Sequence, residues 1–312
     1  MRYNRFYTPV DVKPFVQKCD FSHSFGFIGS CFSDEMYSKF RRYGFTAWQS
    51  PFGTTYNPLS ILHQIDIFLD LNIQLRYDQQ DEIFFSWETS HTLLAETQET
   101  LSHKLQEKRL AIREALLKTD VLYLTVGSSW AYFLEGDAWP VANCHKMPAS
   151  MFHKRLLTLE EMHTNFDRVQ RKLQECNPNL QVVLTVSPVR HVREGLIDNN
   201  RSKARLIDWC HTLVAQHAHV HYFPAYELVV DELRDYRFYA SDGVHPNAQA
   251  VDFVGQQLQT ACFTEEVVAL LPKIEAVRKL EEHNILDYKE LPRIKYQILA
   301  KKEALSAWDI RW

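Results

Sequence analysis

A serine that follows a short apolar run has the setting of a nucleophile. Residues 25–28 are apolar and predict a buried strand, and Gly29-Ser30 then leads into a helical pattern over residues 33–43. A hydroxyl at such a turn is exposed at the sheet edge, and the N–H groups of a helix N-terminus can stabilise a developing oxyanion. Serine is also a common helix N-cap, so this segment alone leaves both roles open.

A serine nucleophile needs a base, and the base needs a carboxylate that orients it. Asp242 and His245 are three residues apart in Asp242-Gly243-Val244-His245-Pro246, just before a helical pattern over residues 246–260. At this spacing the carboxylate can reach the imidazole while the ring faces Ser30. The alternative is a solvated aspartate in a turn beside a capping histidine. We interpret Ser30, His245 and Asp242 as a catalytic triad.

The rest of the chain alternates apolar runs with amphipathic ones. Predicted strands cover residues 25–28, 45–49, 121–126, 181–186 and 220–223, with a hairpin piece at 83–87; predicted helices cover 33–43, 59–71, 90–118, 159–176, 201–216 and 246–260. Strands separated by helices of about ten residues or more indicate βαβ crossovers and a parallel sheet. Ligands of such sheets bind outside the carboxyl ends of the strands, so the loops after these strands should form the site.

Residues 1–263 are predicted to form one α/β catalytic domain. The charged stretch 264–312, balanced in sign, reads as a mostly helical C-terminal extension packed on that domain. We see no flexible linker, internal repeat or low-complexity tract between them.

Composition excludes several classes of function. The 312 residues are 46% hydrophobic with a net charge of −4, which argues against a disordered chain and against a basic nucleic-acid-binding field. No stretch of about 18 apolar residues occurs and residues 1–18 carry charge throughout, so we expect neither a membrane helix nor a signal peptide. The 6 cysteines are scattered, which favours free thiols and a cytoplasmic location.

The string Gly29-Ser30-Cys31-Phe32-Ser33 resembles the motif of the GSCFA family, which has Ala in the last place, within the SGNH (GDSL-type) hydrolase superfamily. Further strings resemble the family, and the similarity spans roughly residues 21–255. These strings are Gly53-Thr54-Thr55-Tyr56-Asn57-Pro58, Val141-Ala142-Asn143-Cys144-His145-Lys146, Thr185-Val186-Ser187-Pro188-Val189-Arg190-His191 and Asp235-Tyr236-Arg237-Phe238-Tyr239.

The resemblance implies a three-layer α/β/α sandwich of flavodoxin-like type, with Ser30 as nucleophile, His245 as base and Asp242 as its partner. In the superfamily a Gly and the Asn of a GxND string complete the oxyanion hole. Gly53 matches the Gly, but this chain has Gly127-Ser128-Ser129-Trp130 where GxND is expected. Asn143 or the Gly127/Ser128 backbone could replace the missing Asn.

The rim loops also hold candidate substrate-binding residues. Arg190, His191 and Arg193 follow the fourth strand, where they could hold an acid, a phosphate or sugar hydroxyls, or else form a solvated basic loop. Trp130 and Tyr56 could stack on a sugar or simply pack in the core. The alternating His217, His219 and His221 lack a Cys or carboxylate at ligand spacing, and no nucleotide-binding string occurs, so we expect no metal and no cofactor.

The hypothesis is therefore a serine esterase or O-acyltransferase acting on a small-molecule or carbohydrate ester. Two alternatives stay open. A non-catalytic binding or scaffold protein on a degenerate hydrolase fold would explain the missing Asn, and thiol chemistry at Cys31 would use the residue beside the proposed nucleophile.

Overall fold

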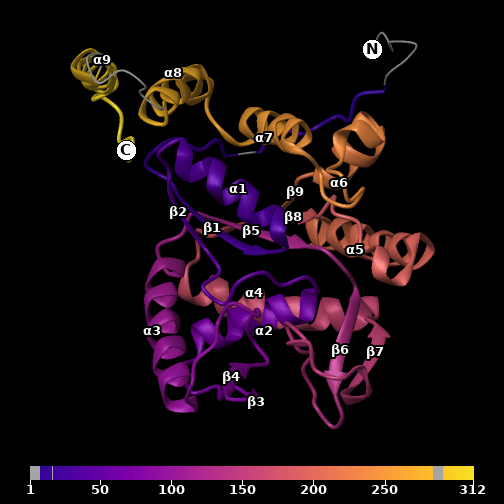
Figure 1. The fold of residues 1–312 in the computed structure, drawn as a ribbon. Helices are drawn as coiled ribbons and strands as arrows, with labels where there is room; N and C mark the ends of the chain where they lie inside the picture. Colours follow the sequence, from indigo (N-terminus) through magenta and orange to yellow (C-terminus); the bar gives the residue numbers. More distant parts are fainter. Residues whose placement is uncertain (1–7, 16, 284–290) are drawn as a thin grey trace.

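A five-stranded parallel sheet runs through the middle of the computed structural model, which describes residues 8–15, 17–283 and 291–312 (Figure 1). The strands are β1 (Ser24–Gly29), β2 (Thr46–Gln49), β5 (Val121–Val126), β8 (Gln181–Val186) and β9 (Val220–Tyr222). Their order is β2-β1-β5-β8-β9, so the chain reverses its direction of travel across the sheet between β1 and β5. This is the flavodoxin-like order, whose switch point is the usual ligand site.

Alternation along the strands gives the sheet two apolar faces. Phe25 and Phe27 on β1 join one core cluster together with Tyr123 of β5. Ile28 on β1 and Leu124 on β5 join the other cluster. A parallel sheet buried on both faces has this near-continuous apolar pattern, which is why these strands could be predicted from sequence.

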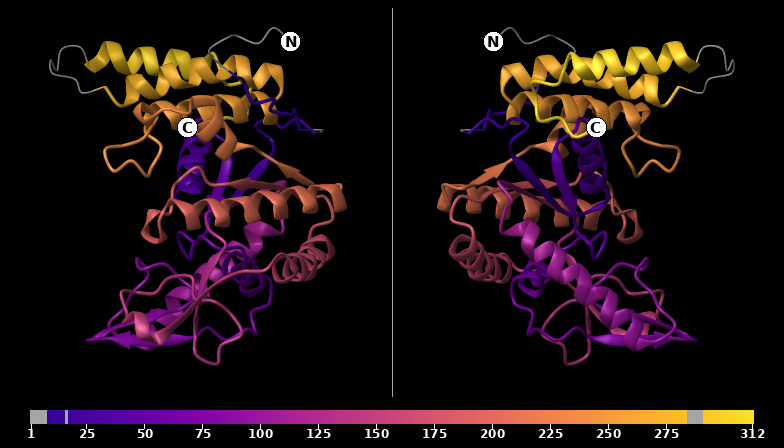
Figure 2. Two further views of the ribbon diagram at one scale, coloured as in Figure 1. Left: turned by 90° about the vertical axis from the view of Figure 1, so that its right-hand side faces the viewer. Right: turned by 90° about the vertical axis from the view of Figure 1, so that its left-hand side faces the viewer.

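Helices cover both faces and complete a three-layer α/β/α sandwich, as predicted. On one side lie α1 (Cys31–Arg42), the short α6 (Ala225–Glu227) and α7 (Ala248–Cys262). On the other lie α2 (Pro58–Leu69), α3 (Gln98–Leu116), α4 (Leu159–Cys176) and α5 (Leu196–Gln216). Figure 2 shows the same layering from two further sides.

Two antiparallel hairpins extend from the sandwich. They are β3 (Tyr77–Gln80) with β4 (Ile83–Ser86), and β6 (Trp130–Leu134) with β7 (Phe152–Leu156). The sequence predicted only part of the first hairpin and did not predict the second. The helix predicted over 90–118 begins later, at Gln98, because the Thr97 side chain accepts from the Thr100 N–H and caps the helix there.

The C-terminal stretch packs on the α1 side of the sandwich. It contains α8 (Glu265–Glu281) and α9 (Leu291–Glu303), which lie side by side in Figure 2. The Arg42 guanidinium of α1 pairs with Glu275 and Glu282, and the N–H of Arg311 donates to the carbonyl of Gly44 at 2.9 Å. Residues 284–290 of the predicted extension lie outside the described residues. The division at residue 263 stays a prediction.

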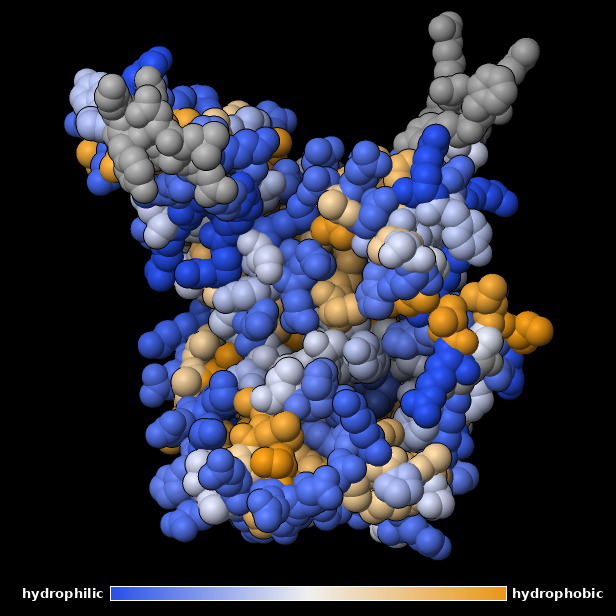
Figure 3. Space-filling view, in the orientation of Figure 1, coloured by the Kyte–Doolittle hydropathy of each residue, from blue (hydrophilic) through white to orange (hydrophobic). Residues whose placement is uncertain are grey.

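The surface is mainly hydrophilic. Figure 3 shows apolar residues on one face as separate patches within a larger polar area. Within the described ranges, no helix is long and apolar enough to cross a membrane.

Candidate active site

Ser30 stands directly after β1, at the switch point of the sheet. Gly29 before it has φ +146°, and a Cβ there would lie 2.1 Å from the Thr125 carbonyl oxygen, so only glycine fits. The close approach lets the Ser30 N–H donate to that oxygen at 3.0 Å. Ser30 is the N-cap residue of α1, but its side chain makes no capping bond.

The Ser30 hydroxyl is fully buried, so the expectation of a hydroxyl exposed at the sheet edge was wrong, and it has no hydrogen-bond partner among the described residues. Burying an unpaired hydroxyl costs about 1–3 kcal/mol, so natural proteins keep one chiefly where it has a use. Since the side chain does not cap the helix, the N-cap interpretation leaves this hydroxyl unexplained.

Asp242 and His245 form a bonded pair, as their spacing predicted. Oδ2 of Asp242 lies 2.7 Å from Nδ1 of His245, while Oδ1 accepts from the N–H groups of Val244 at 2.8 Å and His245 at 3.1 Å. The bonds from the ring and the two amides lower the pKa of Asp242 to about 2. The carboxylate therefore stays ionised at ordinary pH and holds the imidazole by one nitrogen, which leaves Nε2 for chemistry.

Ser30 and His245 do not share a hydrogen bond in this structure, because the Ser30 hydroxyl has no described partner. The loop of His245 nevertheless lies beside the loop after β8, where the Arg190 N–H donates to the Val244 carbonyl at 3.2 Å. Catalytic hydrogen bonds are often long without substrate and shorten in the complex. The structure thus forms the Asp–His half of the predicted triad and leaves the Ser–His contact unmade.

Three rim loops meet beside Gly127, the residue after β5. A Cβ on Gly127 would lie 2.9 Å from Nε2 of His191, 3.3 Å from Cδ1 of Tyr56 and 3.5 Å from Cβ of Ser30. The rings of Tyr56 and His191 meet edge to face, with centroids 5.3 Å apart. The loops after β1, β2, β5 and β8 are therefore brought together here, as the sheet topology predicted.

Two of the predicted oxyanion donors are occupied. The N–H of Gly53 donates to the Ser50 carbonyl at 3.1 Å, and the N–H of Gly127 donates to the Tyr56 carbonyl at 2.7 Å. The Ser128 N–H also donates to Tyr56, at 3.1 Å. In this structure the assignment of these backbone amides as oxyanion donors is wrong, because each already has an acceptor.

The residue in the place of the GxND Asn serves another purpose. Ser129 is buried, its N–H donates to Oγ of Ser202 on α5 at 2.7 Å, and its hydroxyl donates to the Ser202 carbonyl at 3.2 Å. Its side chain is thus committed to α5. Asn143 has its Oδ1 bonded to the His145 N–H at 2.8 Å, and its side chain lines the neighbouring cleft.

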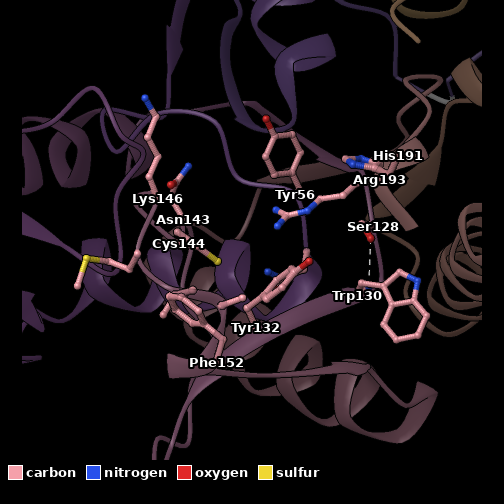
Figure 4. A pocket seen from close by; sticks show the side chains of 15 residues that line it. Tyr56, Ser128, Trp130, Tyr132, Asn143, Cys144, Lys146, Phe152, His191 and Arg193 are labelled. Carbon is pink, nitrogen blue, oxygen red and sulfur yellow. Dashed lines mark hydrogen bonds between the residues drawn. The ribbon is translucent and has the colours of Figure 1, made fainter. Parts of the chain in front are cut away.

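A cleft of about 540 Å³ opens next to this meeting point (Figure 4). Figure 4 shows Arg193 reaching between Tyr56 and Tyr132, with Asn143 and Lys146 on the opposite wall. Tyr56 and His191 belong both to the cleft and to the space beside Ser30. The residues that line the cleft are Tyr56, Asn57, Ser128, Trp130, Tyr132, Val141, Ala142, Asn143, Cys144, Lys146, Met147, Ala149, Phe152, His191 and Arg193. None of these lining residues is acidic.

Not every predicted substrate-binding residue lies in the cleft. Tyr56, Trp130 and His191 do, but the Arg190 guanidinium lies over the rings of Tyr239 and Tyr236, 4.2 and 4.8 Å from their centroids. Arg190 is therefore a packing residue of the His245 loop here, and its prediction as a substrate ligand is wrong for this conformation. Arg193, three residues further along the chain, lines the cleft instead.

Two further ionisable groups lie near the site. Burial, with a smaller contribution from Asp34, raises the pKa of Cys31, so this cysteine is held as a thiol, which disfavours it as the nucleophile. Lys203 of α5 is fully buried and donates to the Ser187 carbonyl at 2.6 Å. Burial lowers its pKa to about 7.

Two of the three alternating histidines near β9 have separate hydrogen-bond partners. Nε2 of His217 lies 3.0 Å from Asp167, and Nε2 of His221 lies 3.0 Å from Gln181. No cluster of three or more His, Cys, Asp or Glu side chains suited to a metal was found in the part of the chain that the structure describes.

The sheet order and the flanking helices define a flavodoxin-like three-layer α/β/α fold. The chain belongs to the GSCFA family, whose model matches residues 24–258. No curated protein matches the chain.

Solved structures with a similar fold include three esterases or acylhydrolases. A carbohydrate esterase of family 3 from Talaromyces cellulolyticus is 8% identical, with 80% of this chain and 98% of that one covered and a TM-score of 0.36. A putative acylhydrolase from Bacteroides fragilis is 10% identical, with 83% and 91% covered and a TM-score of 0.39. An acetyl xylan esterase from Butyrivibrio proteoclasticus is 10% identical, with 82% and 66% covered and a TM-score of 0.40.

Proposed function

We propose that the protein is a serine esterase or O-acyltransferase that acts through an acyl-enzyme. The observation that carries this proposal is the buried, unpartnered hydroxyl of Ser30 at the switch point of the sheet. The bonded Asp242–His245 pair supports it, because its loop joins the β8 loop that also borders Ser30.

The reaction follows from these groups. Ser30 Oγ attacks the ester carbonyl carbon while Nε2 of His245 takes the hydroxyl proton, and Asp242 stabilises the imidazolium. The tetrahedral intermediate collapses with cleavage of the bond to the alcohol oxygen, which receives the proton from His245. Water, or a second hydroxyl in a transferase, then attacks the acyl-enzyme with His245 again as base. This cycle needs no cofactor.

An O-acylated carbohydrate is the substrate class that suits the cleft best. Tyr56 and Trp130 give flat surfaces for a sugar ring, and Asn143 and His191 add polar groups for hydroxyls. All six cysteines are free, which agrees with the proposed cytoplasmic location.

Hydrolysis of 4-nitrophenyl acetate tests the proposal, with Ser30→Ala against Ser33→Ala. Ser33 is a matched control, since its hydroxyl is also buried without a described partner in the same first turn of α1. We expect Ser30→Ala to abolish the enzymatic rate and Ser33→Ala to retain it. Equal rates for wild type and Ser30→Ala would reject the assignment.

A second candidate is a non-catalytic binding protein on this fold. The specific observation that favours it is the unmade Ser30–His245 contact, together with the commitment of Ser129 to α5. This candidate predicts a folded protein without hydrolysis, in which Ser30→Ala leaves the binding of a sugar in the cleft unchanged.

A further inference from the structure

The proposed reaction needs a hydrogen-bond donor for the oxyanion, and three of the backbone amides considered for this role are engaged. The N–H groups of Ser30, Gly53 and Gly127 donate to carbonyls within the fold. An acyl transfer without any such donor would lose about 10²–10³-fold in kcat for each one missing. A side chain can supply what these three amides do not.

We infer that Nε2 of His191 is this donor and that it replaces the side-chain amide missing after β5. The inference rests on the proposed function. It is based on the surroundings of Gly127. A Cβ placed on this glycine would lie 2.9 Å from Nε2 of His191 and 3.5 Å from Cβ of Ser30, so both side chains border the same small space. His191 reaches from the β8 loop over the residue after β5 and borders the same space as the nucleophile.

The neighbouring polar side chains are less suited to this task. Ser129 is bonded to α5 through both its N–H and its hydroxyl. Asn143 lies on the opposite wall of the cleft from Arg193, and none of its atoms is among the three nearest to a Cβ placed on Gly127. His191 is the polar side chain whose atom lies nearest to the added carbon at Gly127.

His191 is held in position on several sides. Its backbone N–H donates to Oδ1 of the buried Asn199 at 2.9 Å, and its ring packs edge to face on Tyr56. The preceding residue, Arg190, donates its N–H to the Val244 carbonyl. A donor fixed before the reaction costs no reorganisation as charge develops, which is the requirement for stabilising an oxyanion.

The same geometry explains why the residue after β5 is glycine. Gly127 has no strained backbone angle, so alanine fits its conformation, yet the added methyl would occupy the space between His191 and Ser30. Gly127→Ala therefore displaces the imidazole from the nucleophile without removing it, which gives a second and independent way to break the proposed contact.

The experiment measures kcat, KM and the pH profile of 4-nitrophenyl acetate hydrolysis for His191→Ala, His191→Asn and Gly127→Ala. We expect kcat to fall about 10²–10³-fold in His191→Ala and Gly127→Ala with KM little changed. His191→Asn should recover part of the loss, since an amide also donates. The acid limb of the profile should be unchanged, because the base is His245. His103→Ala, on the exposed side of α3, is the control.

Three results would overturn the inference. Wild-type kcat in His191→Ala would show that the ring does not act in the reaction. Loss of the acid limb in His191→Asn, with its retention in His245→Ala, would make His191 the base. Equal loss in His191→Ala and His191→Asn with lowered melting temperatures would make its role structural.

A wild-type protein without hydrolysis would refute the proposed function and this inference together. An active enzyme that is insensitive to the substitutions at 127 and 191 would refute only the inference.

Discussion

Nδ1 of His245 lies 2.7 Å from Oδ2 of Asp242, and the other oxygen of the same carboxylate accepts two amide hydrogens from the loop between them. Hydrogen bonds within residues 242–245 therefore fix the position of the carboxylate and the orientation of the ring together. The pair is about half exposed, at 48% and 51% of side-chain area, so its order comes from these local bonds and not from burial.

Asp242→Asn should reduce kcat about 10⁴-fold with little change in KM. An amide can donate to Nδ1 and so favours the tautomer in which Nε2 carries the proton and cannot act as base. Steady-state kinetics on 4-nitrophenyl acetate measure this. Activity within tenfold of wild type would show that Asp242 does not orient the base.

The Asp242 carboxyl should not titrate near pH 4 in the pH profile of the wild type. The pKa of Asp242 is lowered to about 2, so its stabilising effect is present above its ordinary pKa of 3.8 and is lost only as pH falls through about 2. Measured kcat/KM should therefore show no proton uptake by this carboxylate near pH 4. A proton uptake near pH 4 that is absent from Asp242→Asn would contradict this.

Lys203→Met should stabilise the protein at pH 7. Burial lowers the folded pKa of Lys203 from 10.5 to about 7, so the unfolded chain binds more protons between these values and wild-type stability rises as pH increases from 7 to 10.5. This pKa shift lowers the free energy of unfolding of the wild type by about 4–5 kcal/mol at neutral pH. Lys203→Met should recover this amount, reduced by the contribution of the hydrogen bond to Ser187 that it loses. Denaturant unfolding at pH 7 and pH 10 measures it.

The control is Lys118→Met, at an exposed position after α3, which should leave the pH dependence as in wild type. A Lys203→Met protein that is less stable than wild type at pH 7 and keeps the same pH slope would show that the ammonium is not penalised by burial.

Gly29→Ala should lower the free energy of unfolding by about 3 kcal/mol or more. The methyl would lie 2.1 Å from the Thr125 carbonyl oxygen, at a backbone φ of +146° that side chains rarely adopt. Gly136→Ala has a φ of +81° but meets nothing within 4 Å, so it should cost only about 1 kcal/mol. Urea unfolding compares the two; equal costs would mean that β1 and β5 do not approach this closely.

Arg193→Gln should lower kcat/KM selectively for esters that carry a negative charge. Arg193 lines the cleft, and it makes no ion pair with a side chain that the structure describes. The loss should be about tenfold for 4-nitrophenyl hemisuccinate and small for neutral 4-nitrophenyl butyrate. Arg190→Gln is the matched control, since that guanidinium lies over two tyrosine rings. Equal losses for both esters would refute the selectivity.

The strands and the two segments that hold the candidate catalytic residues could be predicted because their signals are local. Apolar runs such as 121–126 mark buried strands, and the Asp242–His245 bond forms within four consecutive residues. The Gly29-Ser30 turn likewise follows from a strand that ends where a helix begins.

What the sequence did not show depends on contacts between distant segments. The amides of Gly53 and Gly127 find acceptors only when the rim loops fold against each other, and His191 meets Ser30 across a third residue. The burial of Lys203 is not expected from its residue type, because lysine is usually solvated. The signal that could have indicated it is its position in the helix, among the buried residues Asn199, Ser202 and Leu206.

Labelling by a fluorophosphonate probe tests the central claim most directly, because the probe reacts with an activated serine and the modified residue can be located by peptide mass spectrometry. The account predicts one adduct, on Ser30, that is absent from Ser30→Ala, strongly slowed in His245→Ala and retained in Ser33→Ala. A folded wild-type protein that remains unlabelled, or an adduct on any residue other than Ser30, would contradict it.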